Sequence, residues 1–251
     1  MPSRTATTIC CGKMRTKEIQ PKFVSIVGAG GKTTALRALA RALAPHRVLV
    51  TTTTHMFPVP PPDCRTVLTD PMPDELLLQL ALPGAVCAGR QAESGKLCAL
   101  SPDLLTQAAA AADIVLCEAD GAHRLPLKLH RADEPVLAPQ TDLYLIIAGL
   151  SALGKPVQDV VHRYALHPDW AANPKQLVGI PELLYCVRET AAACGLPMEK
   201  LRVLLNQADT PALSAMAEPA AQALRADGLD CRIGSLRSDP DLLYRWLFSE
   251  T

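Results

Sequence analysis

The sequence predicts an α/β protein in three layers, with a mostly parallel sheet and helices on both of its faces. Short apolar segments of strand character alternate with longer segments in which apolar residues recur at helical spacing. The first strand, 23–27, runs through a glycine-rich turn into a helical pattern that begins near residue 32. With 251 residues, of which 49% are hydrophobic, the chain is long enough for a substantial core.

The other elements follow from the same two periodicities. Further strands are expected at 46–50, 85–88, 113–118, 141–150, 202–206 and 231–234, and helices at 74–81, 181–194, 211–226 and 242–248. Ser101 and Pro102 have the residue types of an N-cap and a first helical position, so another helix should begin there. The run 91–97 indicates a hairpin turn, and the last helix should dock onto the sheet.

Residues 28–34, with the sequence Gly-Ala-Gly-Gly-Lys-Thr-Thr, join the first strand to the first helix. Strand, glycine turn, lysine and hydroxyl form the phosphate cradle of P-loop proteins, in which backbone N–H groups and the helix dipole attract phosphate. The usual pattern has a glycine where this chain has Ile26, so the loop is a short form like that of Mur-type ligases. The alternative is a tight turn with a surface lysine. The residues expected to hold the nucleotide here are Gly28, Ala29, Gly30, Gly31, Lys32, Thr33 and Thr34. We expect a three-layer fold like that of P-loop NTPases.

The bulk composition excludes several other classes. Lys and Arg total 25, as do Asp and Glu, so no net field favours nucleic acid or a membrane surface. No apolar run is long enough to span a bilayer, and the first 20 residues lack the apolar core of a signal peptide. The nine cysteines are scattered and form no C-x-x-C pair, which suggests reduced thiols in a cytoplasmic protein. We expect a flexible extension over 1–21 and a single nucleotide-binding domain over 22–251.

The strand at 113–118 ends in Glu118-Ala119-Asp120-Gly121. An apolar strand that ends in an acid is typical of the Walker B arrangement, whose carboxylate holds Mg²⁺ or orients the attacking group. The hydroxyl of Thr33 and the carboxylates of Glu118 and Asp120 are therefore the expected metal ligands. Lys32, which should reach the β- and γ-phosphates, and both carboxylates are also the expected catalytic groups. A strand that simply ends at an acidic turn is the alternative.

Two further segments are candidates for ligand contact. Four threonines, 51–54, and His55 end the second strand, where parallel sheets bind ligands, although threonines are also good strand residues. The prolines at 58–62 indicate an extended loop, which is a candidate lid or substrate loop. The loop 125–135 carries Lys128, which we count among the catalytic candidates, and it either holds a substrate or is a solvated charged loop.

Asn206 and Asp209 follow another strand and have the spacing of the guanine-reading N-K-x-D motif of GTPases. Gln207 stands where that motif has lysine. A strand-to-helix turn with an N-cap aspartate is the alternative, so ATP and GTP both remain open as the nucleotide.

Taken together, several segments resemble the YqeC family, whose members are regarded as accessory proteins of selenium-dependent molybdenum hydroxylases. The matching segments are 28–34, 51–55, 118–122, 125–128, 134–135, 149–155, 162–163 and 206–209. The resemblance runs from about residue 22 to the C-terminus, and Gln207 departs from the lysine that is usual in the family. It implies a role in selenium or molybdenum cofactor biosynthesis, with a molybdenum hydroxylase or other cofactor-maturation proteins as partners.

Residues and resemblance together lead to three hypotheses. The first is a Mg²⁺-dependent, NTP-hydrolysing accessory protein with ATP or GTP as its ligand. The second is a small-molecule kinase or ATP-dependent ligase-like enzyme, whose substrate is held by Lys128, Glu134, Lys155 and His162. The third is a non-catalytic, nucleotide-dependent binding module. No nucleic acid or membrane partner is expected under any of them.

Overall fold

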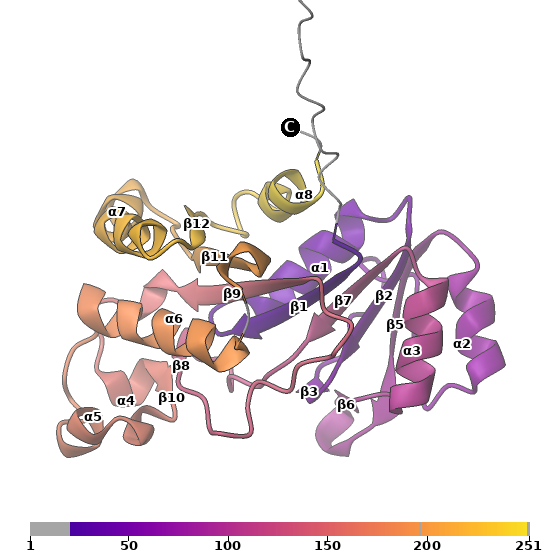
Figure 1. The fold of residues 1–251 in the computed structure, drawn as a ribbon, viewed down its shortest axis with the longest axis horizontal. Helices are drawn as coiled ribbons and strands as arrows, with labels where there is room; N and C mark the ends of the chain where they lie inside the picture. The colour runs from indigo at the N-terminus through magenta and orange to yellow at the C-terminus, as the bar shows by residue number, and fades with distance from the viewer. Residues whose placement is uncertain (1–20, 196, 250–251) are drawn as a thin grey trace, which may run out of the picture.

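A ten-stranded sheet runs through the centre of the protein (Figure 1). The computed structural model describes residues 21–195 and 197–249. The strand order is β12-β11-β9-β1-β7-β2-β5-β6-β3, and β4 pairs with β5 beside this path. The pairs that β6 forms with β3 and β5 are antiparallel, and the other pairs of this sheet are parallel. The expected α/β class with a mostly parallel sheet is confirmed.

The strands of the large sheet are β1 (Phe23–Gly28), β2 (Arg47–Thr52), β3 (His55–Met56), β4 (Thr66–Thr69), β5 (Gly84–Gln91), β6 (Leu97–Cys98), β7 (Ile114–Glu118), β9 (Leu143–Gly149), β11 (Leu201–Asn206) and β12 (Asp230–Ile233). A second, two-stranded sheet joins β8 (Leu127–Lys128) to β10 (Val161–His162). The predicted strands are thus confirmed, while β3, β4, β6, β8 and β10 were not predicted as strands. Four of these five have only two residues, too few for a periodic pattern.

The helices are α1 (Lys32–Ala42), α2 (Pro73–Leu80), α3 (Pro102–Ala111), α4 (Val157–Val160), α5 (Pro168–Ala172), α6 (Ile180–Cys194), α7 (Pro211–Ala226) and α8 (Leu242–Leu247). Short 3₁₀ helices lie at Glu93–Gly95, Leu150–Ala152, Tyr164–Leu166 and Met198–Lys200. The hydroxyl of Ser101 accepts the N–H of Leu104, which confirms the predicted cap of α3. Within the described part of the chain, no helix has both the length and the apolar character needed to cross a bilayer.

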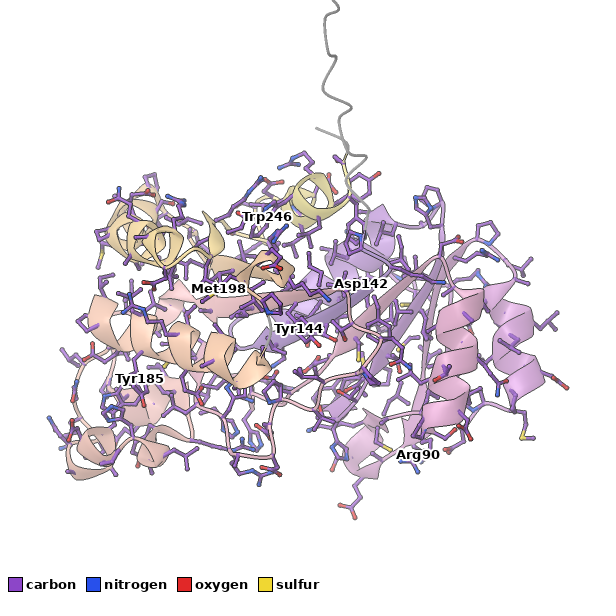
Figure 2. The ribbon with its side chains drawn as sticks, in the orientation of Figure 1. Arg90, Asp142, Tyr144, Tyr185, Met198 and Trp246 are labelled. Carbon is purple, nitrogen blue, oxygen red and sulfur yellow. The ribbon has the colours of Figure 1, made fainter. Side chains whose placement is uncertain are left out.

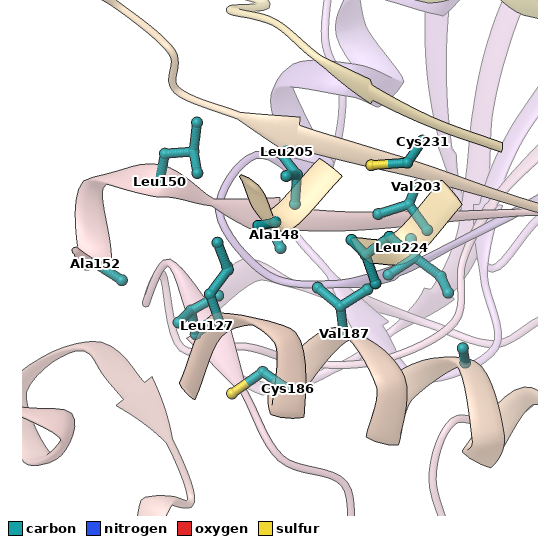
Figure 3. Close-up of a cluster of buried hydrophobic side chains, with 14 of the residues drawn as sticks. Leu127, Ala148, Leu150, Ala152, Cys186, Val187, Val203, Leu205, Leu224 and Cys231 are labelled. Atoms are coloured by element: carbon teal, nitrogen blue, oxygen red, sulfur yellow. The ribbon is translucent and has the colours of Figure 1, made fainter. Parts of the chain in front are cut away.

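Alternate residues of each strand face opposite layers of the protein. In β9, the side chains of Leu143, Leu145 and Ile147 pack in the cluster that contains α1 and α8. Tyr144 and Ile146 pack on the other side with α6 and α7. Figure 3 shows part of that cluster, with Ala148 of β9, Val187 of α6 and Leu224 of α7 labelled. A third cluster places α2 and α3 over β2, β5 and β7. Helices therefore cover both faces of the sheet.

The C-terminal helix α8 docks as the sequence predicts. Leu243 and Leu247 are buried in the cluster that contains α1. The indole of Trp246 donates a hydrogen bond to Asp230 at 3.1 Å, and the guanidinium of Arg232 lies 4.8 Å from its ring centroid (Figure 2). These contacts hold α8 against β12 as well as against α1.

The N-terminal residues and the cysteines bear on two further predictions. The extension expected over 1–21 lies, except for Pro21, outside the described residues. Cys10 and Cys11 lie there too, and the seven described cysteines are free thiols.

Candidate functional site

The turn between β1 and α1 is shaped by glycine. Gly30 and Gly31 have φ of 85° and 141°, values that side chains with a Cβ rarely adopt. A Cβ on Gly30 would lie 2.5 Å from the backbone of Gly149, and one on Gly31 would lie 2.3 Å from the amide nitrogen of Asn206. The glycines are therefore required by the close packing of this loop on the ends of β9 and β11, whether or not a ligand binds.

The N-terminus of α1 is open. Its N-cap, Gly31, has no side chain to accept the first N–H groups, and no acidic residue lies in the first turn. By contrast, the hydroxyls of Ser101 and Thr210 cap α3 and α7. Unsatisfied N–H groups and the positive end of the helix dipole make such a terminus a site for anions.

This open terminus faces a cavity of about 600 Å³. The cavity lies at the carboxyl ends of parallel strands, where α/β sheets bind their ligands. Its lining contains five Lys or Arg residues but only two carboxylates. The lining residues are Gly30, Gly31, Lys32, Thr33, Thr34, Thr54, His55, Met56, Phe57, Lys96, Glu118, Gly121, Ala122, His123, Arg124, Leu125, Arg131, Glu134, Arg163 and Gln207. The electrostatic character of the cavity suits an anionic ligand.

Lys32 points back over the loop that precedes it. Its ammonium donates a hydrogen bond to the carbonyl oxygen of Gly28 at 2.6 Å. The same nitrogen lies 2.8 Å from a carboxylate oxygen of Asp120 and 3.8 Å from one of Glu118. The side chain is 5% exposed, and it still contributes to the cavity lining.

Asp120 is the buried centre of the surrounding charge network. Its partners are the N–H of Gly28 (2.9 Å), Lys32 Nζ (2.8 Å), Lys128 Nζ (3.0 Å) and His130 Nε2 (2.8 Å). Burial opposes its ionisation, but Lys32, the His130 hydrogen bond and Lys128 together hold the pKa of Asp120 well below its usual range. Asp120 does not belong to the cavity lining, so the structure places it beneath the loop, where it accepts from protein groups.

Glu118, the last residue of β7, does line the cavity. Burial raises the pKa of its carboxyl to about 7, an effect that Lys32 opposes and Asp120 reinforces. Of the two predicted acids, Glu118 is thus the one that a ligand in the cavity could reach. A pKa near neutrality also matches what proton transfer requires.

Lys128 links the charge network around Asp120 to two residues of the cavity lining, Glu134 and Arg163. The ammonium of Lys128, which is 2% exposed, donates to the carbonyl of Gly121 at 2.8 Å and to Glu134 at 3.1 Å. Two guanidinium nitrogens of Arg163 donate to Glu134. Burial opposes the ionisation of Glu134, but Arg163 and Lys128 outweigh the effect of burial and lower the pKa of this carboxyl to about 2. Glu134 and Arg163 line the cavity, whereas Lys128 lies behind them.

His130 connects Asp120 to the helix α6. Its Nε2 lies 2.8 Å from Asp120, and its Nδ1 lies 3.0 Å from a carboxylate oxygen of Glu189. Burial and Lys128 work against protonation, but the two carboxylate hydrogen bonds prevail and raise the pKa of His130. Sequence reasoning missed Glu189, because it is 59 residues from His130 and no local pattern marks it.

The threonine run divides into two parts. The hydroxyls of Thr51, Thr52 and Thr53 donate to main-chain carbonyls of neighbouring segments. Their acceptors are Ala88 (2.8 Å), Glu118 (2.7 Å) and Val136 (2.5 Å). Thr54 and His55 line the cavity. Only this last part of the run is therefore placed to contact a ligand there.

Asn206 and Asp209 have different surroundings. Asn206 donates to the carbonyl of Gly30 at 2.8 Å and accepts the N–H of Leu236 at 3.0 Å, so it fixes the glycine loop. Asp209 is exposed and accepts the hydroxyl of Ser235 at 2.5 Å. Gln207 lines the cavity, and Asp209 does not.

Lys155 and His162, two of the residues expected to hold a substrate, are not part of the cavity lining. Lys155 is exposed. The ring of His162 stacks on that of His123 with centroids 4.5 Å apart. Burial and the charge of Arg163 lower the pKa of His162 to about 4. His162 is thus a neutral support for a cavity residue.

The lining also contains Phe57, Lys96 and Arg124, none of which the sequence singled out. Lys96 lies in the segment 91–97, whose residue types indicate only a hairpin turn. Arg124 lies three residues after Gly121, and no local pattern marks it as a cavity residue.

The sheet is mostly parallel, and its first strand leads through a glycine loop into a helix with an open N-terminus. This arrangement fits a P-loop-like three-layer fold. A sequence profile described as "YqeC protein" matches residues 24–165. Over 185 residues the chain is 33% identical to "Uncharacterized protein YqeC" of Escherichia coli (strain K12). That alignment covers 69% of this chain and 70% of the relative. The chain belongs to the YqeC family, as the sequence motifs indicated.

Proposed function

We propose that this protein binds a nucleoside triphosphate, ATP or GTP, in the cavity beside α1. The observation that carries the proposal is the open N-terminus of an eleven-residue helix, with Lys32, Thr33 and Thr34 beside a cavity of about 600 Å³. Unsatisfied N–H groups, a helix dipole and a lysine are the elements with which proteins hold polyphosphates. A structural turn alone does not require these groups to face a cavity.

The oxygen donors of the cavity also suit Mg²⁺. Thr33, which is exposed, and Glu118 both line it, and Mg²⁺ prefers hard ligands such as their hydroxyl and carboxylate oxygens. Within the described residues, no group of three or more His, Cys, Asp or Glu is arranged to hold a metal. Thr33 and Glu118 would therefore share the ion with phosphate oxygens and water, as is usual for Mg²⁺ at nucleotide sites. The bound ion would neutralise charge on the phosphates.

We further propose that the nucleotide is hydrolysed, with Glu118 as the group that accepts a proton or orients the attacking water. Steady phosphate release from the protein alone would support this activity. Release that needs a small acceptor would instead indicate a kinase or a ligase-like enzyme, and binding without turnover would indicate a binding module. By family resemblance, this chemistry would serve the maturation of a selenium-dependent molybdenum hydroxylase.

Nucleotide binding is tested with Lys32→Ala against the matched control Lys155→Ala. We expect Lys32→Ala to weaken binding of ATP and GTP at least about tenfold in titration calorimetry, the loss expected for one charged hydrogen bond. Lys155→Ala, at an exposed site outside the cavity, should change nothing. Thr33→Ala should keep the fold and lose the Mg²⁺ dependence of binding. Because Lys32 is buried, circular dichroism must first show that its variant is folded. Equal affinity of Lys32→Ala and the unaltered protein would refute the proposal.

Competition between GTP and ATP tests the choice of base. Preferential binding of GTP that is lost in Asp209→Ala would support recognition of guanine by Asp209. Equal or tighter binding of ATP would exclude that role.

A further inference from the structure

The cavity has a second basic wall, separate from the glycine loop. Phe57 follows β3, Lys96 precedes β6, and His123 and Arg124 lie in the loop after β7. The ammonium of Lys96 and the guanidinium of Arg124 each lie 5.2 Å from the centroid of the Phe57 ring. Three segments that are distant in the sequence thus bring two cations to one aromatic ring.

Neither Lys96 nor Arg124 has an ion-pair partner among the described residues, whereas the other cations of the cavity lining do. Arg163 is paired with Glu134, Arg131 with Asp133, and Lys32 with Asp120. Among the residues that the structure describes, no carboxylate lies within ion-pair distance of Lys96 or Arg124. Cation–π contact with Phe57 offsets part of their repulsion. The charge of Lys96 also acts on Glu118 across the cavity, but neither cation has a carboxylate in direct contact.

The backbone of the cavity lining is strained at four positions, two of which, His123 and Arg124, belong to this wall. Six described residues other than glycine have positive φ, and four of them line the cavity. These four are His123 (48°), Arg124 (63°), Arg163 (62°) and Gln207 (68°). Such conformations are costly for residues with a Cβ, and they gather at ligand sites. Here three of the four carry side chains that can bind an anion.

We propose that Lys96 and Arg124, held on Phe57, form a subsite for a phosphate group of a second small-molecule ligand that binds beside the nucleotide. A phosphate monoester carries nearly two negative charges at neutral pH, which matches the two unpaired cations, whereas a carboxylate would leave one of them uncompensated. The triphosphate itself is served by Lys32, the α1 terminus and the ion at Thr33 and Glu118. This inference rests on the proposed function, because it places the second phosphate beside a bound nucleotide.

The test uses inorganic phosphate as the probe. The full chain is saturated with Mg²⁺ and a non-hydrolysable triphosphate, and phosphate is titrated while its ³¹P resonance is followed. We expect one phosphate site, weakened about tenfold to a hundredfold in Lys96→Gln and in Arg124→Gln, the range expected for one lost charged hydrogen bond. Triphosphate affinity should remain within about twofold in both variants, since neither residue contributes to the glycine loop. The double variant Lys155→Gln/Lys175→Gln, which removes two exposed lysines outside the cavity, should behave like the unaltered protein.

Three results would overturn the subsite. The first is that the nucleotide-saturated protein binds no phosphate, and the second is that it binds acetate more tightly than phosphate. The third is that the Lys96→Gln and Arg124→Gln variants lose as much affinity for the triphosphate as for phosphate. The last would assign both cations to the nucleotide. If no nucleotide binds at all, the proposed function fails, and phosphate is titrated into Lys32→Ala instead. If Lys32→Ala binds phosphate and the double variant Lys32→Ala/Arg124→Gln does not, the subsite is still supported. If Lys32→Ala binds no phosphate, or if the double variant binds it equally well, the subsite is refuted.

Discussion

Replacing Glu118 with glutamine should change how the stability of the protein depends on pH. The carboxyl is buried at the end of β7, and burial raises its pKa from the ordinary value of 4.5 to about 7. In the unfolded chain the same group titrates near its ordinary value. Glutamine has almost the same size and can keep the site filled, but it does not titrate in this range.

The sign follows from which state holds the proton more tightly. Below pH 4.5 both states are protonated, and the full contribution to stability is present. As the pH rises toward 7, the unfolded chain releases its proton first, so the free energy of unfolding falls. The difference between 4.5 and about 7, at about 1.4 kcal/mol for each tenfold change in proton affinity, corresponds to roughly 3 kcal/mol. Above about pH 7 this loss is complete.

Urea denaturation of both proteins, with EDTA present and at half-unit steps from about pH 5 to about pH 8, measures the effect. We expect the free energy of unfolding of Glu118→Gln, relative to the unaltered protein, to increase with pH by about 2–3 kcal/mol over this range. Other titrating groups are common to both proteins and cancel in the difference. A difference that stays constant over the whole range would show that Glu118 titrates normally and would refute the reasoning.

Three further substitutions test the packing of the glycine loop. Asp120→Ala leaves two buried lysines without their shared carboxylate and should lower the free energy of unfolding by about 3–5 kcal/mol in urea titration, whereas the exposed Asp133→Ala should change it by less than about 0.5 kcal/mol; similar values for the two would contradict the network. Asn206→Ala leaves the partly buried carbonyl of Gly30 and the buried N–H of Leu236 without partners and should cost about 1–3 kcal/mol; an unchanged melting temperature would show that these bonds contribute nothing. Gly31→Ala should cost a similar amount, because its Cβ would meet the Asn206 amide. The double variant Gly31→Ala/Asn206→Ala should lose less than the sum of the single losses, and strict additivity would show that the two sites do not touch.

The regular elements could be predicted because their signals are local. Helical spacing and apolar runs marked the long helices and the strands of the sheet centre, and the serine and proline before α3 marked its start. The short edge strands β3 and β4 could not be found in this way, since their pairing depends on where β5 and β6 lie. The order of strands is likewise a property of the whole chain.

The residues of the candidate site could be predicted only where they are close together in the sequence. The glycine loop is contiguous in the sequence, and its residues line the cavity except for Gly28 and Ala29. Which acid faces the cavity was not predictable, because the chain leaves β7 after Glu118 and turns Asp120 beneath the loop. The basic wall was missed for a similar reason, since Lys96 and Arg124 meet at Phe57 only after the sheet has formed.

The burial of Asp120 has a consequence for any ligand of the glycine loop. Lys32 already has an anion, supplied by the protein, so a phosphate that bound there would exchange one counter-ion for another. The resting pair keeps the loop ordered and its lysine in place, which lowers the entropic cost of binding. It also sets a threshold: an anion with too little charge to compete with Asp120 leaves Lys32 where it is. Discrimination between phosphate chains of different length can therefore begin with this internal pair.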